Sequence, residues 1–96
     1  MDIRTVKHTY RSGPNKGVTT TRFECRNAQA PMITVSEILG ETTFGVSYAS
    51  THICDVADVD TGLKVAEAIQ SQMTDCRHDI HVMRDIANTT LTEASA

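Results

Sequence analysis

A chain of 96 residues has room for one domain, 1–96, and excludes a second hydrophobic core. Hydrophobic residues make up 40% of it and charged residues 22%, which excludes a wholly disordered chain. The net charge of −3 is unevenly divided: residues 1–26 carry six basic and two acidic side chains, and residues 27–96 carry three basic and ten acidic ones.

The composition also bears on the core and on the cellular location. Tryptophan is absent, so Ile, Val, Leu, Met and Ala must supply a small core, which a second subunit often stabilises. The charged start MDIRTVKHTYR does not resemble a signal peptide, and no stretch approaches the roughly 18 apolar residues of a membrane span. Three cysteines cannot all pair within one chain. We therefore predict reduced thiols, a cytoplasmic location and no membrane partner.

Residues 2–11 and 18–26 are predicted to form a β-hairpin. Both stretches are rich in Thr, Val, Ile, Tyr and Phe, and the turn formers SGPNKG lie between them. The period of two in a strand gives the second stretch two faces, one meeting the core and one meeting water. One face holds Thr19, Thr21, Phe23 and Cys25, and the other holds Val18, Thr20, Arg22, Glu24 and Arg26.

A second hairpin is predicted from MITVSEIL and TTFGVSYAST, which flank a turn at Gly40-Glu41. Apolar residues alternate with polar ones in both stretches, so both strands are expected to be half buried. The stretch HICDV either extends the last strand or adds a short fifth one. Residues 1–57 are therefore predicted to form an antiparallel sheet of four or five strands.

Residues 58–88 are predicted to form one long helix. Asp58 or Asp60 can cap its start, and neither Pro nor Gly occurs from residue 63 to residue 88. Apolar side chains at alternating spacings of three and four form a heptad seam. Its members are Ala66, Ile69, Met73, Cys76, Ile80, Met83 and Ala87.

Two details of this helical region stay open in the sequence. A break at Thr74-Asp75, with a second helix folding back onto the sheet, is the alternative to one continuous helix. The tail, 89–96, is expected to fray. The fold class is α+β in either case.

A continuous helix would be longer than the sheet that it covers. About 28 residues at about 1.5 Å each run about 42 Å, whereas strands of eight or nine residues span about 30 Å. The far end of the seam would then lack cover, and a second copy of the helix is the simplest cover. We therefore predict a homodimer whose interface consists of Met73, Cys76, Ile80, Met83 and Ala87.

The stretch TDCRHDIHVM, 74–83, brings one cysteine close to two histidines. On a helix, His78 points about 200° away from Cys76, so these side chains cannot reach one ion. His78, His81 and Asp85 do share the polar face, but the spacings match no standard zinc pattern. We predict no metal and no cofactor.

Other patterns for catalysis are incomplete. His52 and Cys54 are predicted to share a strand face, yet the sequence offers no third group to orient them. DVADVDTG lacks the central Gly and terminal Glu of a calcium loop, and no helix follows SGPNKG as a phosphate loop requires. We predict no catalytic residues and a protein that is not an enzyme.

The first hairpin is the main electrostatic feature. A basic β-ribbon can lie along a phosphate backbone, and the residues that would contact it are Lys7, Arg11, Lys16, Arg22 and Arg26. The acidic helical region would repel the same ligand. The alternative is a solvated hairpin whose charges keep an edge strand from pairing with neighbours.

From these observations we predict a non-catalytic protein-interaction module, a small homodimeric inhibitor or regulator that binds another macromolecule, with an unidentified protein as partner. In size and expected architecture it resembles small phage-encoded inhibitors of host defences, anti-CRISPR proteins among them. The rival functions are a nucleic-acid-binding regulator that uses the basic hairpin and a small metal-dependent or thiol enzyme.

Overall fold

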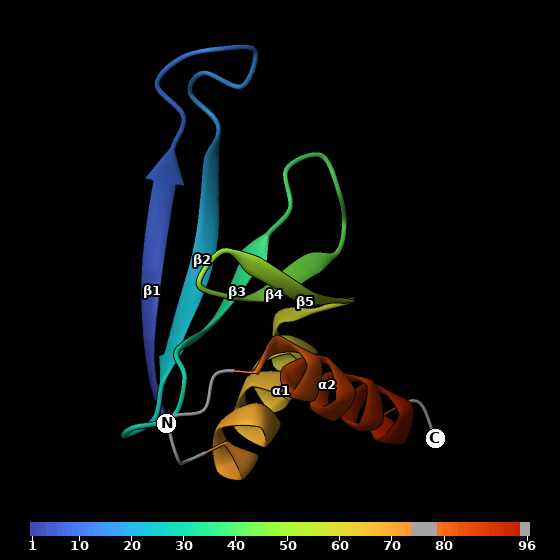
Figure 1. Ribbon diagram of the computed structural model, residues 1–96. Helices are drawn as coiled ribbons and strands as arrows, with labels where there is room; N and C mark the ends of the chain where they lie inside the picture. Colours follow the sequence, from blue (N-terminus) through green and yellow to red (C-terminus); the bar gives the residue numbers. More distant parts are fainter. Residues whose placement is uncertain (74–78, 95–96) are drawn as a thin grey trace.

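The computed structural model describes residues 1–73 and 79–94, and in it one face of an antiparallel sheet is covered by two helices (Figure 1). Each strand pairs with the next one along the chain, in the order β1-β2-β3-β4-β5. The predicted α+β class and antiparallel sheet are confirmed, and HICDV belongs to a fifth strand. The strands are β1 (Asp2–Thr9), β2 (Thr19–Arg26), β3 (Ile33–Glu37), β4 (Phe44–Tyr48) and β5 (Thr51–Val56).

The two faces predicted for the second strand are also confirmed. Cys25 is fully buried and Phe23 packs partly against the core, whereas Arg22 and Arg26 are exposed. The β1–β2 register runs without interruption from Asp2 opposite Arg26 to Thr9 opposite Thr19. Strand β2 pairs with β3 only over residues 22–25, so the rest of the hairpin is a ribbon of two strands.

The turn between β4 and β5 interrupts the stretch predicted as one strand, 42–51. Ala49 and Ser50 have φ values of 48° and 68°, in the left-handed region that two-residue hairpin turns require. Asn and Gly are the usual residues of such a turn. Because Ala-Ser contains neither Asn nor Gly, the sequence pattern left open whether HICDV extends the strand or forms a fifth one.

The predicted single helix over 58–88 is two helices, α1 (Val59–Gln72) and α2 (Ile80–Ala94). The chain leaves the helical conformation at Met73, with φ −120° and ψ 64°. Helix α2 begins where Asp79 Oδ1 accepts hydrogen bonds from the backbone N–H groups of His81 (2.9 Å) and Val82 (3.4 Å). The interval between the two helices thus contains the suggested Thr74-Asp75, which itself lies outside the described residues, and the alternative of two helices is the one observed. Helix α2 also continues to Ala94, past the expected start of fraying at residue 89.

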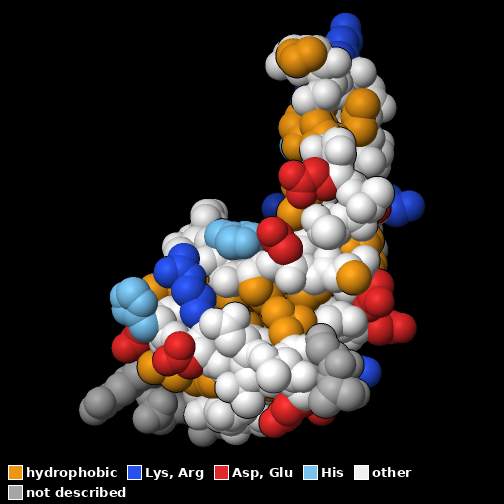
Figure 2. Space-filling view, turned by 90° about the vertical axis from the view of Figure 1, so that its right-hand side faces the viewer, with side chains coloured by type: hydrophobic (Ala, Val, Ile, Leu, Met, Phe, Trp, Pro, Cys, Tyr) orange, Lys and Arg blue, Asp and Glu red, His pale blue; other side chains and the backbone are white. Residues whose placement is uncertain are grey.

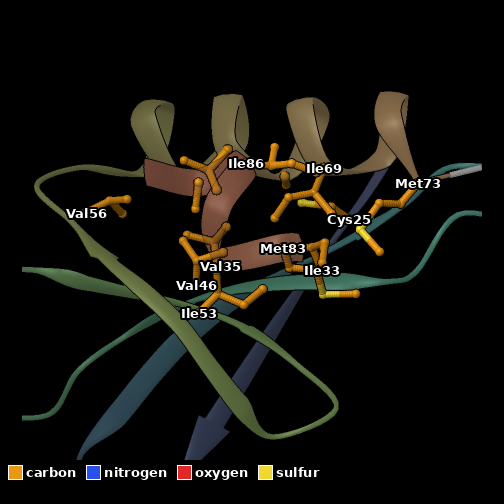
Figure 3. Packing of buried hydrophobic residues seen from close by; sticks show 13 residues of the cluster. Cys25, Ile33, Val35, Val46, Ile53, Val56, Ile69, Met73, Met83 and Ile86 are labelled. Atoms are coloured by element: carbon orange, nitrogen blue, oxygen red, sulfur yellow. The ribbon is translucent and has the colours of Figure 1, made fainter. Parts of the chain in front are cut away.

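The core lies between the helices and strands β2 to β5 (Figure 3). Met73, Met83 and Ala87, three members of the predicted dimer interface, are buried within this single chain, and Ile80 packs partly against the same core. Cys76 lies outside the described residues. Because α2 folds back onto α1 and β5, the helices in the described part of the chain leave no overhang that needs cover from a second copy. The homodimer itself stays a prediction, but the reason given for it, a continuous helix that overhangs the sheet, does not hold.

Among the described residues, the polar side chains of Gln70 and Arg84 attach the helices to the sheet. The buried Gln70 Nε2 donates hydrogen bonds to the carbonyls of Cys25 (2.8 Å) and Pro31 (3.0 Å), which fixes the β2–β3 connection to α1. Arg84 donates from Nε (3.2 Å) and Nη2 (2.7 Å) to the carbonyl of His52 on β5. Both helices are therefore anchored by specific backbone acceptors as well as by apolar packing.

At Gly62, α1 lies close against the sheet, because a Cβ there would lie 2.7 Å from Val35 Cγ1. We predict that Gly62→Ala lowers the free energy of unfolding by about 1–3 kcal/mol through overpacking. Helix propensity alone would raise it by about 1 kcal/mol. Urea denaturation measures the change, with the exposed Lys64→Ala as the control. The loss should shrink in a Val35→Ala background; a stabilised Gly62→Ala would contradict this packing.

Asp58 confirms the predicted helix cap, since its Oδ1 accepts a hydrogen bond from the backbone N–H of Thr61 (2.8 Å). The hydrogen bonds from Thr61 hold the pKa of the Asp58 carboxyl below its ordinary value. A lowered pKa gives stability that is present above the unfolded pKa of about 3.9 and is lost as pH falls through the folded pKa. Asp58→Ala should therefore lower the melting temperature at pH 7, and the pH-dependent part of the difference should disappear in acid. Asp58→Asn, which keeps an acceptor, is the control; a difference that grows in acid would contradict the assignment.

Candidate interaction surface

We refer to the β1–β2 hairpin, residues 2–26, as the arm. Its outer part projects beyond the helical body (Figure 2), whereas its base pairs with β3 and includes the buried Cys25. Helix α1 packs on β3, β4 and β5, and α2 packs on α1 and β5. All residues of β1 except the half-buried Val6 are exposed. The arm is therefore held mainly by backbone pairing, and most of its side chains are accessible to a partner.

The charge of the arm is almost entirely positive. No acidic residue occurs between Asp2 and Glu24, and five basic residues lie in this interval. They are Arg4, Lys7, Arg11, Lys16 and Arg22. The part of the chain that follows the arm carries the excess of acidic residues, so the molecule is electrically polar.

The structure does not gather the five predicted phosphate-contacting residues on one surface. Lys7 and Arg11 line the same hollow of about 570 Å³ near the end of the arm, and Lys16 lies in the loop at its tip. The register places Lys7 opposite Thr21, so Arg22 is on the other face of the ribbon. Arg26 is at the far end of β2, opposite Asp2.

Arg22 is also partly neutralised. Its Nη2 lies 3.6 Å from Glu24 Oε2, two residues along the same face. One phosphate backbone lying along a single face could thus reach only part of the predicted set.

A second hollow, of about 290 Å³, lies on the face of the sheet that the helices leave bare. Hydroxyl side chains predominate, and Arg22, Glu37 and His8 are also present. The lining residues are His8, Tyr10, Thr20, Arg22, Thr34, Ser36, Glu37, Ser47 and Ser50. Sequence reasoning missed this hollow, although the alternation of Thr34, Ser36 and Ser47 with buried residues is a signal for it.

The outer side of β1 carries backbone groups without partners in the described part of the chain. Tyr10 N–H donates to the Val18 carbonyl (3.0 Å) and Tyr10 O accepts from Gly17 N–H (2.8 Å), so the backbone of Tyr10 faces β2. Backbone groups of successive residues in a strand point to alternate sides. The N–H and C=O groups of every second residue of β1 therefore point away from the sheet. These residues are Ile3, Thr5, Lys7 and Thr9.

His52 and Cys54 do not share a face, which corrects the prediction. A register shift between Val46 and Ser47 pairs Cys54 with Val46 on the helix side and His52 with Ser47 on the bare side. Burial, and secondarily the Asp55 carboxylate, raise the pKa of the Cys54 thiol to about 11, which disfavours the thiolate that nucleophilic attack requires. His52 Nε2 instead lies 3.3 Å from Asp55 Oδ1.

The histidine candidates of the helical region fall partly outside the structure. His78 and Cys76 are not among the described residues. His81 is exposed in the first turn of α2, and Asp85 is exposed one turn later. Across residues 1–73 and 79–94, no group of three His, Cys, Asp or Glu side chains is arranged to hold a metal ion.

Comparison with known proteins gives no independent guide. No protein-family model, curated protein or solved structure matches this chain. None of the helices in the described part of the chain has the length and apolar character needed to cross a membrane. A functional proposal must therefore rest on the arm and the faces of the sheet.

Proposed function

We propose that this protein is a non-catalytic protein-interaction module, a small inhibitor or regulator that binds another protein through its arm. The observation that supports this proposal is a projecting, positively charged hairpin whose outer strand is an uncovered sheet edge. An exposed edge of this kind is a template for pairing with another chain unless something blocks it. Protein recognition by strand edges is a recurrent binding mode.

The electrostatics of the arm add selectivity to this proposal. Charges of one sign on a projecting element steer partners of opposite sign toward it and exclude partners of like sign. Because the charge is distributed on both faces of the ribbon, with Lys7 and Arg22 on opposite sides, a partner can meet a basic residue on either face. The arm therefore favours an acidic partner surface over a neutral one.

Nucleic-acid binding is the second candidate, supported by the same interval of five basic residues without an acid. Three observations weigh against it: the opposite faces of Lys7 and Arg22, the ion pair between Arg22 and Glu24, and the net charge of −3. Binding by phosphate contacts falls steeply with salt. A nuclease step and a salt series distinguish this candidate from the first.

The test is affinity capture from a lysate of the source cells at about 150 mM salt, near physiological ionic strength. Lys7→Glu and Lys64→Glu form a matched pair, since both lysines are exposed, both lie in regular structure and both changes reverse one charge. We expect a nuclease-resistant protein partner whose recovery falls about tenfold with Lys7→Glu, a loss of about 1.4 kcal/mol, and is unchanged with Lys64→Glu.

Two results would contradict the proposal. Equal recovery by the Lys7→Glu variant would remove the arm from the interface. Capture of nuclease-sensitive material, lost on changing Arg22 and Arg26 to Ala, would make the nucleic-acid regulator the better account.

A further inference from the structure

We propose that β1 accepts an extended acidic segment of the partner protein as a sixth strand of the sheet. This inference rests on the proposed function and names its binding mode and the chemistry of the partner. The edge offers the outward N–H and C=O groups of four residues, Ile3, Thr5, Lys7 and Thr9, over the eight residues of β1. An added strand can satisfy both the donors and the acceptors.

The two edges of the sheet differ in how far they are blocked. At the β5 edge, the strand is irregular opposite Val46 and Ser47, helix α2 packs beside it, and Arg84 occupies the carbonyl of His52. At the β1 edge the register is continuous, the strand contains no proline, and no comparable side chain occupies its outward carbonyls in the described residues. Bulges, prolines, covering elements and charged side chains are the usual means of protecting an edge. On β1 the protection comes from charged side chains such as Arg4 and Lys7, which repel a basic strand and attract an acidic one, so β1 is the edge available to an acidic segment.

The backbone pattern selects a polypeptide over a nucleic acid. Outward donors alternate with outward acceptors along β1, and a phosphate backbone has acceptors only. The carbonyl oxygens of Thr5 and Lys7 would therefore face phosphate oxygens if a nucleic acid lay along this edge. A second polypeptide strand presents the matching alternation.

The side chains select an acidic segment over a second copy of this chain. Arg4 lies on one face of β1 and Lys7 on the other. Arg22 lies on the neighbouring strand, directly opposite Val6. Pairing two copies through β1 would bring two arms together, each with five basic residues and no acid between residues 3 and 23. Like charges on neighbouring strands destabilise a sheet, whereas Asp or Glu on the added strand would pair with these residues.

The inference is tested by selecting peptides of about eight residues from a random displayed library, matching the length of β1. We expect the selected peptides to be acidic, with β-branched residues between the acids. Their affinity should fall at least about tenfold with Thr5→Pro, which removes an outward N–H that the fold does not use. Thr5→Ala keeps this N–H and is the matched control, so it should bind as the wild type does.

Amide exchange of the wild-type protein with a selected peptide gives a readout that does not depend on the folding of a variant. The peptide should slow exchange at Thr5 and Lys7, whose N–H groups point outward. The inference is overturned if no peptide is enriched, if the enriched peptides lack acids, or if they bind Thr5→Pro equally well. It is also overturned if the protein alone is a dimer that Thr5→Pro dissociates. A partner captured from lysate alongside a failed selection would leave the proposed function standing and remove only this binding mode.

Discussion

Helix α1 packs with Gly62 against Val35 on β3, and α2 packs on α1 and β5, so apolar cover ends at Cys25 and Phe23 on β2. Strand β1 lies beyond that cover and contributes no residue to the buried core. Apart from the half-buried Val6, its side chains face water on both sides of the ribbon, which suits the Thr, Lys, Arg and His found there. The arm is thus a direct consequence of how far two short helices reach across five strands.

This arrangement places stability and recognition in different parts of the molecule. The body between the helices and strands β3 to β5 has the buried side chains, the helix cap at Asp58 and the anchoring contacts of Gln70 and Arg84. From Arg22 toward its tip, the arm is a ribbon of two strands only. An isolated two-stranded hairpin has marginal stability. The Thr21 N–H, which faces away from β1, donates a hydrogen bond to Glu37 Oε2 (3.2 Å). The body therefore also supports the ribbon at its base.

Local patterns in the sequence were sufficient to predict the parts of the fold that are determined by residues close together in the chain. The alternation of residues 19–26 gave the correct faces, SGPNKG gave the first hairpin, and Asp58 gave the start of α1. The basic residues of the arm were also found from the sequence. Their division between two faces follows from the same alternation, but the outermost position of β1 depends on the strand order of the whole sheet.

Features that depend on distant contacts were not predictable from these patterns. The spacing of Met73, Ile80 and Met83 suits a continuous helix and also two helices that fold against each other, since both bury one stripe. Neither Pro nor Gly marks the break in the sequence. Helix α2 instead begins at the Asp79 cap, and the burial of its apolar side chains holds it against the core. The irregularity in β5 adds a residue to one strand, which places His52 and Cys54 on opposite faces, so the period of two gave the wrong result there.

Strand β1 is paired with β2 on one side and open on the other. Hydrogen exchange of the backbone amides of the protein alone measures both sides of this strand at once. The account predicts alternation, with slow exchange at Arg4, Val6 and His8, which face β2, and fast exchange at Thr5, Lys7 and Thr9. Slow exchange at both sets would contradict it by showing an edge already paired, and fast exchange at both would show that the arm is not a folded hairpin.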